Sequence, residues 1–346
     1  MRPVPMIEIV FFAIALLATA AGVAVFLRYG RGLATLDVPN DRSSHHAPTP
    51  RGGGVVIVAV CLLLYLAAAP AGMEPANWSF VVGAIMVAAV SWADDHVDLP
   101  AWIRLSVHAL AAAVLIAGSG PVEGILVPGY GMLAINTVLS YGLTFLWVVW
   151  LINAYNFMDG IDGLAGSQAV VAGVGWAVAA VWFNDEAIYL LAGVVTFSSL
   201  GFLIHNWNPA RVFMGDVGSA FLGYTFAAMP LLVRPSGPEN RYGAFAIAIT
   251  LLWLFLFDTF FTFVRRLLKR ERVWLAHRKH LYQRLVIAGL GHARVSLLYA
   301  VLAAAVGTAY FVSARFGGIV VPLLFLCYLA APAVVLFLAW PRKGLT

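Results

Sequence analysis

Charged residues are scarce in this sequence. Only 11% of its 346 residues are Asp, Glu, Lys or Arg, whereas a soluble domain carries about 25%. Hydrophobic residues make up 62% of the chain, and the mean hydropathy is +0.90. These values exclude an ordinary soluble domain and predict that most of the chain lies in a lipid bilayer.

Cysteine and internal repetition are scarce as well. The two cysteines, Cys61 and Cys327, both lie inside apolar runs and do not form a C-x-x-C pair. This spacing excludes a disulfide framework and a cysteine-based zinc site. The sequence also has no internal repeat and no low-complexity tract.

Long apolar runs are what the sequence has instead. A helical crossing needs about 20 apolar residues, and the candidates lie near 7–27, 54–71, 78–93, 102–119, 137–152, 164–183, 187–204, 217–233, 243–264, 293–313 and 318–340. We expect an all-α, polytopic integral membrane protein with about eleven transmembrane helices, forming a single membrane-embedded domain over 1–346. The first run is too long for a signal peptide and its positive flank follows it, so we interpret it as a retained anchor.

The positive charges predict the orientation of these helices. All but four of the 21 Lys and Arg residues fall on alternate connections or at the C-terminus; the exceptions are Arg2, Arg234, Arg241 and Arg315. Cytoplasmic loops carry the excess of Lys and Arg. We therefore expect a periplasmic N-terminus and a cytoplasmic C-terminus in the inner membrane. The pI of 9.3 then reflects topology, and no nucleic-acid partner is expected.

The unusual polar segments fall on the same side of the membrane as the positive charge. They span 28–53, 94–104, 153–163, 205–216 and 265–292. The connections on the other side, such as 71–77 and 184–186, are short or featureless. Five separated segments are thus predicted to converge at one membrane face, which is how an active site on the cytoplasmic face would be built.

Two adjacent acids, Asp94 and Asp95, directly follow an apolar run. Adjacent carboxylates repel each other unless a cation neutralises them. Mg²⁺ commonly binds through one or two carboxylates together with substrate phosphates. The pair therefore favours a Mg²⁺-dependent site, with Mn²⁺ as an alternative, over a solvated helix end.

A second polar group is the N-A-Y-N-F-M-D-G-I-D-G segment, in which Asn153, Asn156, Asp159 and Asp162 recur every third residue. This spacing places successive side chains near one another on a helix. Amide and carboxylate groups at the end of a span are costly without partners. An EF-hand is not expected, since Val170 stands where its final Glu belongs.

Asp216 directly precedes a further apolar run. Its side chain could cap the helix that begins there or bind a metal ion. Basic residues accompany these acids: Arg42, Arg51 and Arg104, then His277, Arg278 and His280. Arginine forks match phosphate oxygens, and a zinc site at the histidines lacks a third ligand. Acids for a divalent metal and bases for phosphates predict phosphoryl transfer between a cytosolic donor and a lipid.

Asp258 lies inside the ninth run, roughly two turns from its cytoplasmic end. A charge within a span normally faces an interior partner. We expect it to pair with an arginine or with His108, supporting the site from below, or to make a structural hydrogen bond without a catalytic role.

The motifs together resemble the polyprenyl-phosphate N-acetylhexosamine-1-phosphate transferase superfamily, glycosyltransferase family 4 in older usage. The resemblance runs from residue 37 to residue 284 through D-V-P-N-D-R-S-S-H-H-A-P-T-P-R-G-G-G, A-D-D, N-x-x-N-F-M-D-G-I-D-G-L-A-G and N-P-A-R-V-F-M-G-D-V-G-S. It implies transfer of a HexNAc-1-phosphate from a UDP-HexNAc to undecaprenyl phosphate, giving undecaprenyl-diphospho-HexNAc and UMP.

The resemblance also implies roles for individual residues. Asp94, Asp95 and Asp216 would be catalytic, the first two by activating the lipid phosphate, and Asn156 and Asp216 would hold Mg²⁺ against the donor pyrophosphate. Substrate-binding positions would be Asp37, Arg42, His45, Arg51, Arg104, Asn153, Asp159, Gly160, Asp162, Phe213, His277, Arg278 and His280.

Two segments depart from the pattern of the peptidoglycan enzymes in this family. The first loop reads Arg42-Ser43-Ser44-His45, and the last reads H-R-K-H-L-Y-Q-R-L in place of a triple-His motif. Both variants resemble the O-antigen-initiating branch, whose donors include UDP-N-acetylfucosamine, UDP-N-acetylquinovosamine and UDP-GlcNAc. We therefore expect an initiating step of O-antigen or other surface glycan synthesis, and the sequence does not choose among these donors.

Two other classes of function fit the composition. A transporter or flippase for a charged lipid or nucleotide-sugar would place its site near the bilayer midplane, often in repeats, whereas these acids lie at the ends of spans. A catalytically silent scaffold would not need acids in every motif. The expected partners are the two substrates and the bilayer, and a homodimer is compatible with the sequence.

Overall fold

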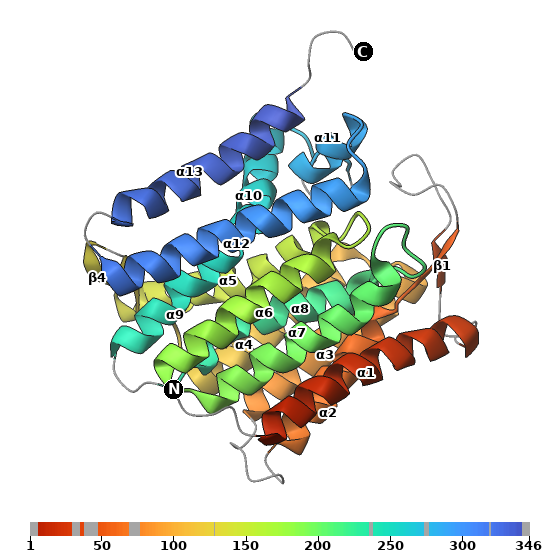
Figure 1. The fold of residues 1–346 in the computed structure, drawn as a ribbon, viewed down its shortest axis with the longest axis horizontal. Helices are drawn as coiled ribbons and strands as arrows, with labels where there is room; N and C mark the ends of the chain where they lie inside the picture. The colour runs from red at the N-terminus through yellow and green to blue at the C-terminus, as the bar shows by residue number, and fades with distance from the viewer. Residues whose placement is uncertain are drawn as a thin grey trace.

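The computed structural model describes residues 6–29, 35–37, 48–68, 77–127, 129–234, 238–272, 277–317 and 320–340. These residues form a helix bundle with two small two-stranded antiparallel sheets (Figure 1). The helices are α1 (Met6–Tyr29), α2 (Gly54–Ala67), α3 (Trp78–Val97), α4 (Ala101–Ser119), α5 (Thr137–Phe157), α6 (Leu164–Phe183), α7 (Glu186–Asn206), α8 (Gly215–Leu232), α9 (Pro238–Leu251), α10 (Trp253–Leu268), α11 (Leu281–Ile287), α12 (His292–Phe316) and α13 (Val320–Ala339). The strands are β1 (Thr35–Asp37), β2 (Thr49–Arg51), β3 (Gly124–Val127) and β4 (Gly131–Ala134).

Over the described residues, each predicted apolar run coincides with one helix or, for the ninth run, with two helices, which confirms a mainly helical, polytopic membrane fold. Eight helices of the described residues are long and apolar enough to cross a bilayer, or nine if the bent pair α9–α10 is one span. Helix α2 has only 14 residues, and α8 lies inside the bundle against α2, α3, α5 and α9. The predicted count of about eleven crossings and the orientation of the termini stay predictions.

The ninth run differs from its prediction as one continuous span. It forms α9 and α10, which meet at Leu252 with a bend of 71°. The polar side chains of α10 account for its separate direction. Asp258, Thr262 and Arg266 are spaced four residues apart, and all three are buried. This spacing lines one face of a helix, so α10 turns a polar stripe toward the protein interior.

The two ends of the bundle carry different structures. Hydrogen bonds link β2 with the segment before α8, and Asp162 after α5 pairs with His292 at the start of α12. At the other end, Arg234 after α8 donates its backbone N–H to Asp185, which caps α7. In Figure 1, β1 and α11 lie at the right end and β4 lies at the left end. All predicted polar segments that the structure describes lie at the end with β1.

Helices α2 and α8 touch through glycine at this end. The backbone N–H of Gly53 donates to Phe213 O (3.0 Å), and that of Gly54 donates to Met214 O (2.8 Å). A Cβ on Gly54 would lie 2.7 Å from Met214 O and 2.8 Å from the backbone nitrogen of Gly218. Only glycine allows this approach. The glycines at 53 and 54 therefore let two segments that are distant in the sequence pack backbone against backbone.

We expect Gly54→Ala to destabilise the protein, because the added methyl group overlaps the backbone of α8. Overpacking of this kind costs about 1–3 kcal/mol, which would lower the thermal unfolding midpoint of the detergent-solubilised protein. Gly142→Ala in α5 is the matched control, since nothing lies within 4 Å of its Cβ position. Equal unfolding midpoints for the two variants would contradict the close contact.

Candidate active site

Three carboxylates and two arginines from four segments meet at the polar end of the bundle. Arg51 Nε lies 2.9 Å from Asp95 Oδ1, and Arg51 Nη2 also pairs with Asp216 Oδ1. Arg104 Nη1 pairs with Asp94 Oδ2 and lies 3.5 Å from Asp216 Oδ2. Asp216 is therefore bridged to Asp95 by one guanidinium group and to Asp94 by the other, so the structure brings the three predicted catalytic acids together.

Asp95 has a second set of contacts, with the backbone at the start of α8. Its Oδ1 accepts from the N–H of Asp216 (2.9 Å) and its Oδ2 accepts from the N–H of Val217 (3.1 Å). A carboxylate at this position satisfies free N–H groups and complements the helix dipole. Asp95 thus fixes the first turn of α8 and, with it, the position of Asp216.

Arg51 is the cation at the centre of this group. Burial opposes its charge, but the carboxylates of Asp216, Asp95 and Asp37 hold the pKa of Arg51 above its ordinary value. Asp37, a predicted substrate-binding residue, lies at the end of β1 and pairs in register with Thr49 of β2. The β1–β2 sheet, which the sequence did not predict, carries Arg51 to the carboxylates.

The N-x-x-N-F-M-D segment at the end of α5 adds amide and acidic groups. Asn156 Oδ1 accepts from Ser219 Oγ of α8 (2.7 Å), and the Asn156 side chain also contacts Asp216. Asp159 keeps part of its surface exposed. Burial of its carboxyl group, together with the nearby charges of Asp216 and Asp95, raises the pKa of Asp159 well above its ordinary value. The positive charge of Arg51 acts in the opposite direction, so Asp159 lies within the electrostatic range of both the arginine and the carboxylates of the cluster.

Asp162 is held by a separate set of partners. Its Oδ2 accepts from Asn208 Nδ2 (2.7 Å) and from the N–H of Ala210 (3.1 Å), and its Oδ1 lies 3.3 Å from His292 Nδ1. Burial opposes ionisation, but these hydrogen bonds hold the pKa of Asp162 below its ordinary value. Asp162 therefore joins three segments at the polar end. Within the described residues it forms no ion pair with Arg51 or Arg104.

Two other predicted residues lie next to these segments. Phe213 forms a bridge with Arg51 and donates its backbone N–H to Pro50 O (2.8 Å). Gly160 lies against the ring of Tyr282, whose hydroxyl donates to Phe157 O (3.0 Å), and a Cβ at Gly160 would lie 3.1 Å from Tyr282 Cζ. Both positions therefore connect the cluster with loops around it.

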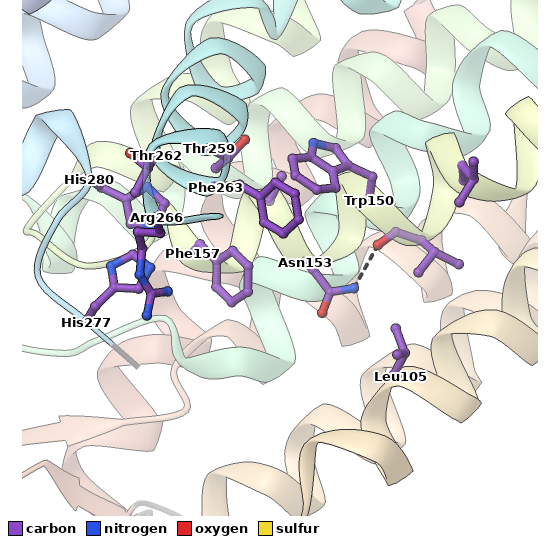
Figure 2. A pocket seen from close by; sticks show the side chains of 13 residues that line it. Leu105, Trp150, Asn153, Phe157, Thr259, Thr262, Phe263, Arg266, His277 and His280 are labelled. Carbon is purple, nitrogen blue, oxygen red and sulfur yellow. Dashed lines mark hydrogen bonds between the residues drawn. The ribbon is translucent and has the colours of Figure 1, made fainter. Parts of the chain in front are cut away.

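An apolar groove of about 390 Å³ opens beside the cluster, between α4, α5 and α10 (Figure 2). Its walls are mainly apolar, and Figure 2 shows Arg266, His277 and His280 gathered with Phe157 at one end and Leu105 at the other. Asn153 faces the groove and donates to Val149 O (2.7 Å). Leu105 directly follows Arg104, so the groove and the charged cluster share α4.

The histidines at the groove differ in their surroundings. Burial and the positive charges of His280, Arg266 and Lys279 lower the pKa of His277 to about 4, so His277 is neutral at neutral pH. His280 Nδ1 lies 3.2 Å from Asp258 Oδ1. The expected pairing of Asp258 with an arginine or with His108 was wrong, whereas the alternative of a structural hydrogen bond is confirmed, because the last loop folds back over α10 and places His280 and the start of α11 there. Arg278 lies between the two histidines and is partly buried.

His108 is a residue whose position the sequence did not reveal. It is 3% exposed, one helical turn beyond Arg104, and neither ring nitrogen has a hydrogen-bond partner within the described ranges. Asn153 lies beside the ring but donates to Val149. Ser219, His292 and Tyr299 were missed in the same way, since a lone polar residue in an apolar run gives no signal of its partner. The predicted residues Arg42 and His45 lie outside the described residues.

The oxygen atoms of the cluster suit a hard divalent cation only in part. No group of three or more His, Cys, Asp or Glu side chains in the described part of the chain could hold a metal by itself. The Asp216 carboxylate and the Asn156 amide oxygen are adjacent hard donors. Mg²⁺ is usually bound by one or two carboxylates plus substrate phosphates. The residues therefore fit Mg²⁺ that is shared with a phosphate-bearing substrate.

Comparison with known proteins identifies the family. Residues 77–234 match the model of glycosyl transferase family 4. The chain is 32% identical to a probable undecaprenyl-phosphate N-acetylglucosaminyl 1-phosphate transferase of Bacillus subtilis, over 84% of this chain and 80% of the relative. It is 30% identical to a decaprenyl-phosphate N-acetylglucosaminephosphotransferase of Mycolicibacterium smegmatis, over 75% and 70%.

A more partial match is a phospho-N-acetylmuramoyl-pentapeptide-transferase of Lactiplantibacillus plantarum, 30% identical over 54% of this chain and 62% of the relative. The family match covers α3 to the end of α8, the helices that bring Asp94, Asp95, Arg104 and Asp216 together. The chain belongs to the polyprenyl-phosphate N-acetylhexosamine-1-phosphate transferase superfamily, the group also described as glycosyl transferase family 4.

Proposed function

We propose that this chain transfers a HexNAc-1-phosphate from a UDP-HexNAc to undecaprenyl phosphate, releasing UMP. The observation that carries the proposal is the joining of a charged cluster, Asp94, Asp216 and Arg104, to an apolar groove through α4. A polyprenyl phosphate has both an apolar chain and an anionic head, so it needs such a pair of adjoining surfaces. The relatives whose names include an undecaprenyl or decaprenyl phosphate support this acceptor.

The groove would bind the first isoprene units and the cluster would receive the phosphate. The apolar wall includes Trp150 and Phe263, and its polar end has Arg266 and His280. A phosphate group at the polar end of this groove needs positively charged partners. The chain and its phosphate can enter sideways from the bilayer, while a nucleotide-sugar enters from the aqueous side of the polar end.

The carboxylate cluster would position the reacting groups. The lipid phosphate is already a charged nucleophile, so it needs positioning and charge shielding more than covalent help. Asp94, paired with Arg104, would accept any remaining proton on the acceptor, and Asp95 would keep α8 in place. Asp216 and Asn156 would hold Mg²⁺, which when bound neutralises charge on the donor diphosphate.

Asp216→Asn should reduce transfer from UDP-GlcNAc to undecaprenyl phosphate by at least about 100-fold, the scale of losing one electrostatic contact to the transition state. Asparagine keeps the shape but removes the charge that binds a cation. The measurement is formation of labelled lipid product by purified enzyme. Chelator should abolish the same activity in the wild type, and added Mg²⁺ should restore it.

The matched control for this variant is Asp98→Asn, an exposed acid at the same end of the bundle with a left-handed backbone that asparagine tolerates. It should retain wild-type transfer. Undiminished turnover of the wild type in chelator would contradict the metal proposal, and full activity of Asp216→Asn would contradict the role of Asp216.

The donor is proposed to be GlcNAc or a 6-deoxy-HexNAc linked to UDP. The names of two relatives contain N-acetylglucosamine, and the first and last loops differ from the triple-His pattern of the peptidoglycan enzymes. The product would begin an O-antigen or another surface glycan. A panel of UDP-GlcNAc, UDP-N-acetylfucosamine and UDP-N-acetylquinovosamine should give lipid product with at least one donor and none with UDP-N-acetylmuramoyl-pentapeptide. Efficient transfer from the pentapeptide nucleotide would refute this choice of donor.

The polar end is proposed to face the cytoplasm, with the protein in the inner membrane, because most Lys and Arg residues lie there. In a variant without Cys61 and Cys327, Ala288→Cys at the polar end should resist a membrane-impermeant maleimide in intact cells. Met132→Cys on β4, 46% exposed, should react. Permeabilised cells provide the control for Ala288→Cys. Labelling of Ala288→Cys from outside would reverse the orientation.

A further inference from the structure

Asp258 is the most completely hydrogen-bonded buried acid of the described residues outside the cluster. It lies on α10 and is 1% exposed. Its oxygens accept from His280 Nδ1 (3.2 Å), the N–H of Leu281 (2.8 Å), the N–H of Tyr282 (3.0 Å), Tyr299 Oη (2.8 Å) and Thr262 Oγ1 (3.2 Å). A carboxylate surrounded by N–H and O–H donors is held as an anion.

These contacts join the groove wall to the last polar loop. Thr259 and Thr262, which follow Asp258 on α10, line the groove from one side, and His280 lines its polar end. Asp258 therefore lies directly behind the surface that a lipid phosphate would meet. A lone structural acid could hold the start of α11 through Leu281 and Tyr282 alone, so the additional contact with the imidazole of His280 requires a separate explanation.

The ring of His280 has a single defined orientation. It lies between Phe157, His277 and Tyr282, with ring centroids at 6.1, 4.8 and 5.9 Å. Because a carboxylate only accepts hydrogen bonds, Nδ1 carries a proton toward Asp258. Nε2, the remaining ring nitrogen, faces away from the contact that Nδ1 makes with Asp258. The contact with Asp258 thus fixes the direction in which Nε2 faces at the polar end of the groove.

We propose that Asp258 is a positioning residue for the transfer reaction: it orients the ring of His280 so that the Nε2–H of its imidazolium form donates a hydrogen bond to a phosphate oxygen at the polar end of the groove. The inference rests on the proposed function. The oxygen belongs to the lipid phosphate or to the donor diphosphate, and the substrate assays below assign it to one of them. Asp258 touches neither substrate and acts only through His280.

A double-mutant cycle tests whether Asp258 acts through His280. Asp258→Asn and His280→Gln should each lower kcat/KM about 10- to 100-fold, the usual range for losing a residue that orients an imidazole. The double variant should be no slower than the slower single variant, because removing the support matters only while His280 is present. The KM for each substrate is measured in the same assays. A selective rise in the lipid KM assigns the oxygen to the acceptor, and one in the UDP-sugar KM assigns it to the donor.

Two further variants keep the test independent of misfolding. Tyr299→Phe removes one donor to Asp258 and should lower kcat/KM about 2- to 10-fold, as for one hydrogen bond, with no further loss in the His280→Gln background. Tyr328→Phe removes a hydroxyl that bonds Thr250 on α9, and since neither residue lines the groove, this variant should leave activity unchanged. Size-exclusion and thermal unfolding profiles report folding for every variant.

The outcomes separate this inference from the function on which it rests. Losses that multiply in the two double variants, in folded protein with an active wild type, would show that Asp258 only stabilises the loop and would overturn the inference. A wild type that transfers no sugar phosphate from any UDP-HexNAc would instead overturn the proposed function.

Discussion

The backbone contact between Gly53–Gly54 and the segment before α8 is the constraint on which the polar end depends. It aligns β2 with Phe213, so that Arg51 leaves the strand beside the first turn of α8. Gly215 supports the same approach with a φ of 77° and a Cβ position 2.7 Å from Asp95 Oδ2. Side chains at these glycines would separate the two segments, and the ion pairs of Arg51 with Asp95 and Asp216 could not form.

The electrostatic order of the cluster follows from this contact. Asp94 and Asp95 are neighbours on α3, yet their carboxylates face different partners: one meets Arg104, and the other meets Arg51 and the start of α8. Adjacent acids would otherwise repel each other. Three carboxylates with two guanidinium groups keep a formal excess of negative charge, which suits the binding of one cation. The same arginines could release a carboxylate to pair with phosphate oxygens when substrates arrive.

The sequence predicted the helices and the meeting of Asp94, Asp216 and Arg104, because long apolar runs and the alternation of charged connections are local signals. It did not predict the bend at Leu252, the β1–β2 sheet or the pairing of Asp258 with His280. These features depend on contacts between segments far apart in the chain. Asp258 and His280 are 22 residues apart with a loop between them, and no periodicity in that interval shows that the loop folds back over α10.

The bend between α9 and α10 shapes both the apolar groove and the position of Asp258. In a straight span, α10 would continue along the axis of α9. The 71° bend instead places α10 against α5, and the groove beside Trp150 and Phe157 lies between these two helices. Because α10 also holds His280 through Asp258, one helix shapes the apolar surface and the polar end together. If the groove binds the lipid as proposed, the lipid would contact the same helix that holds His280 through the buried carboxylate of Asp258.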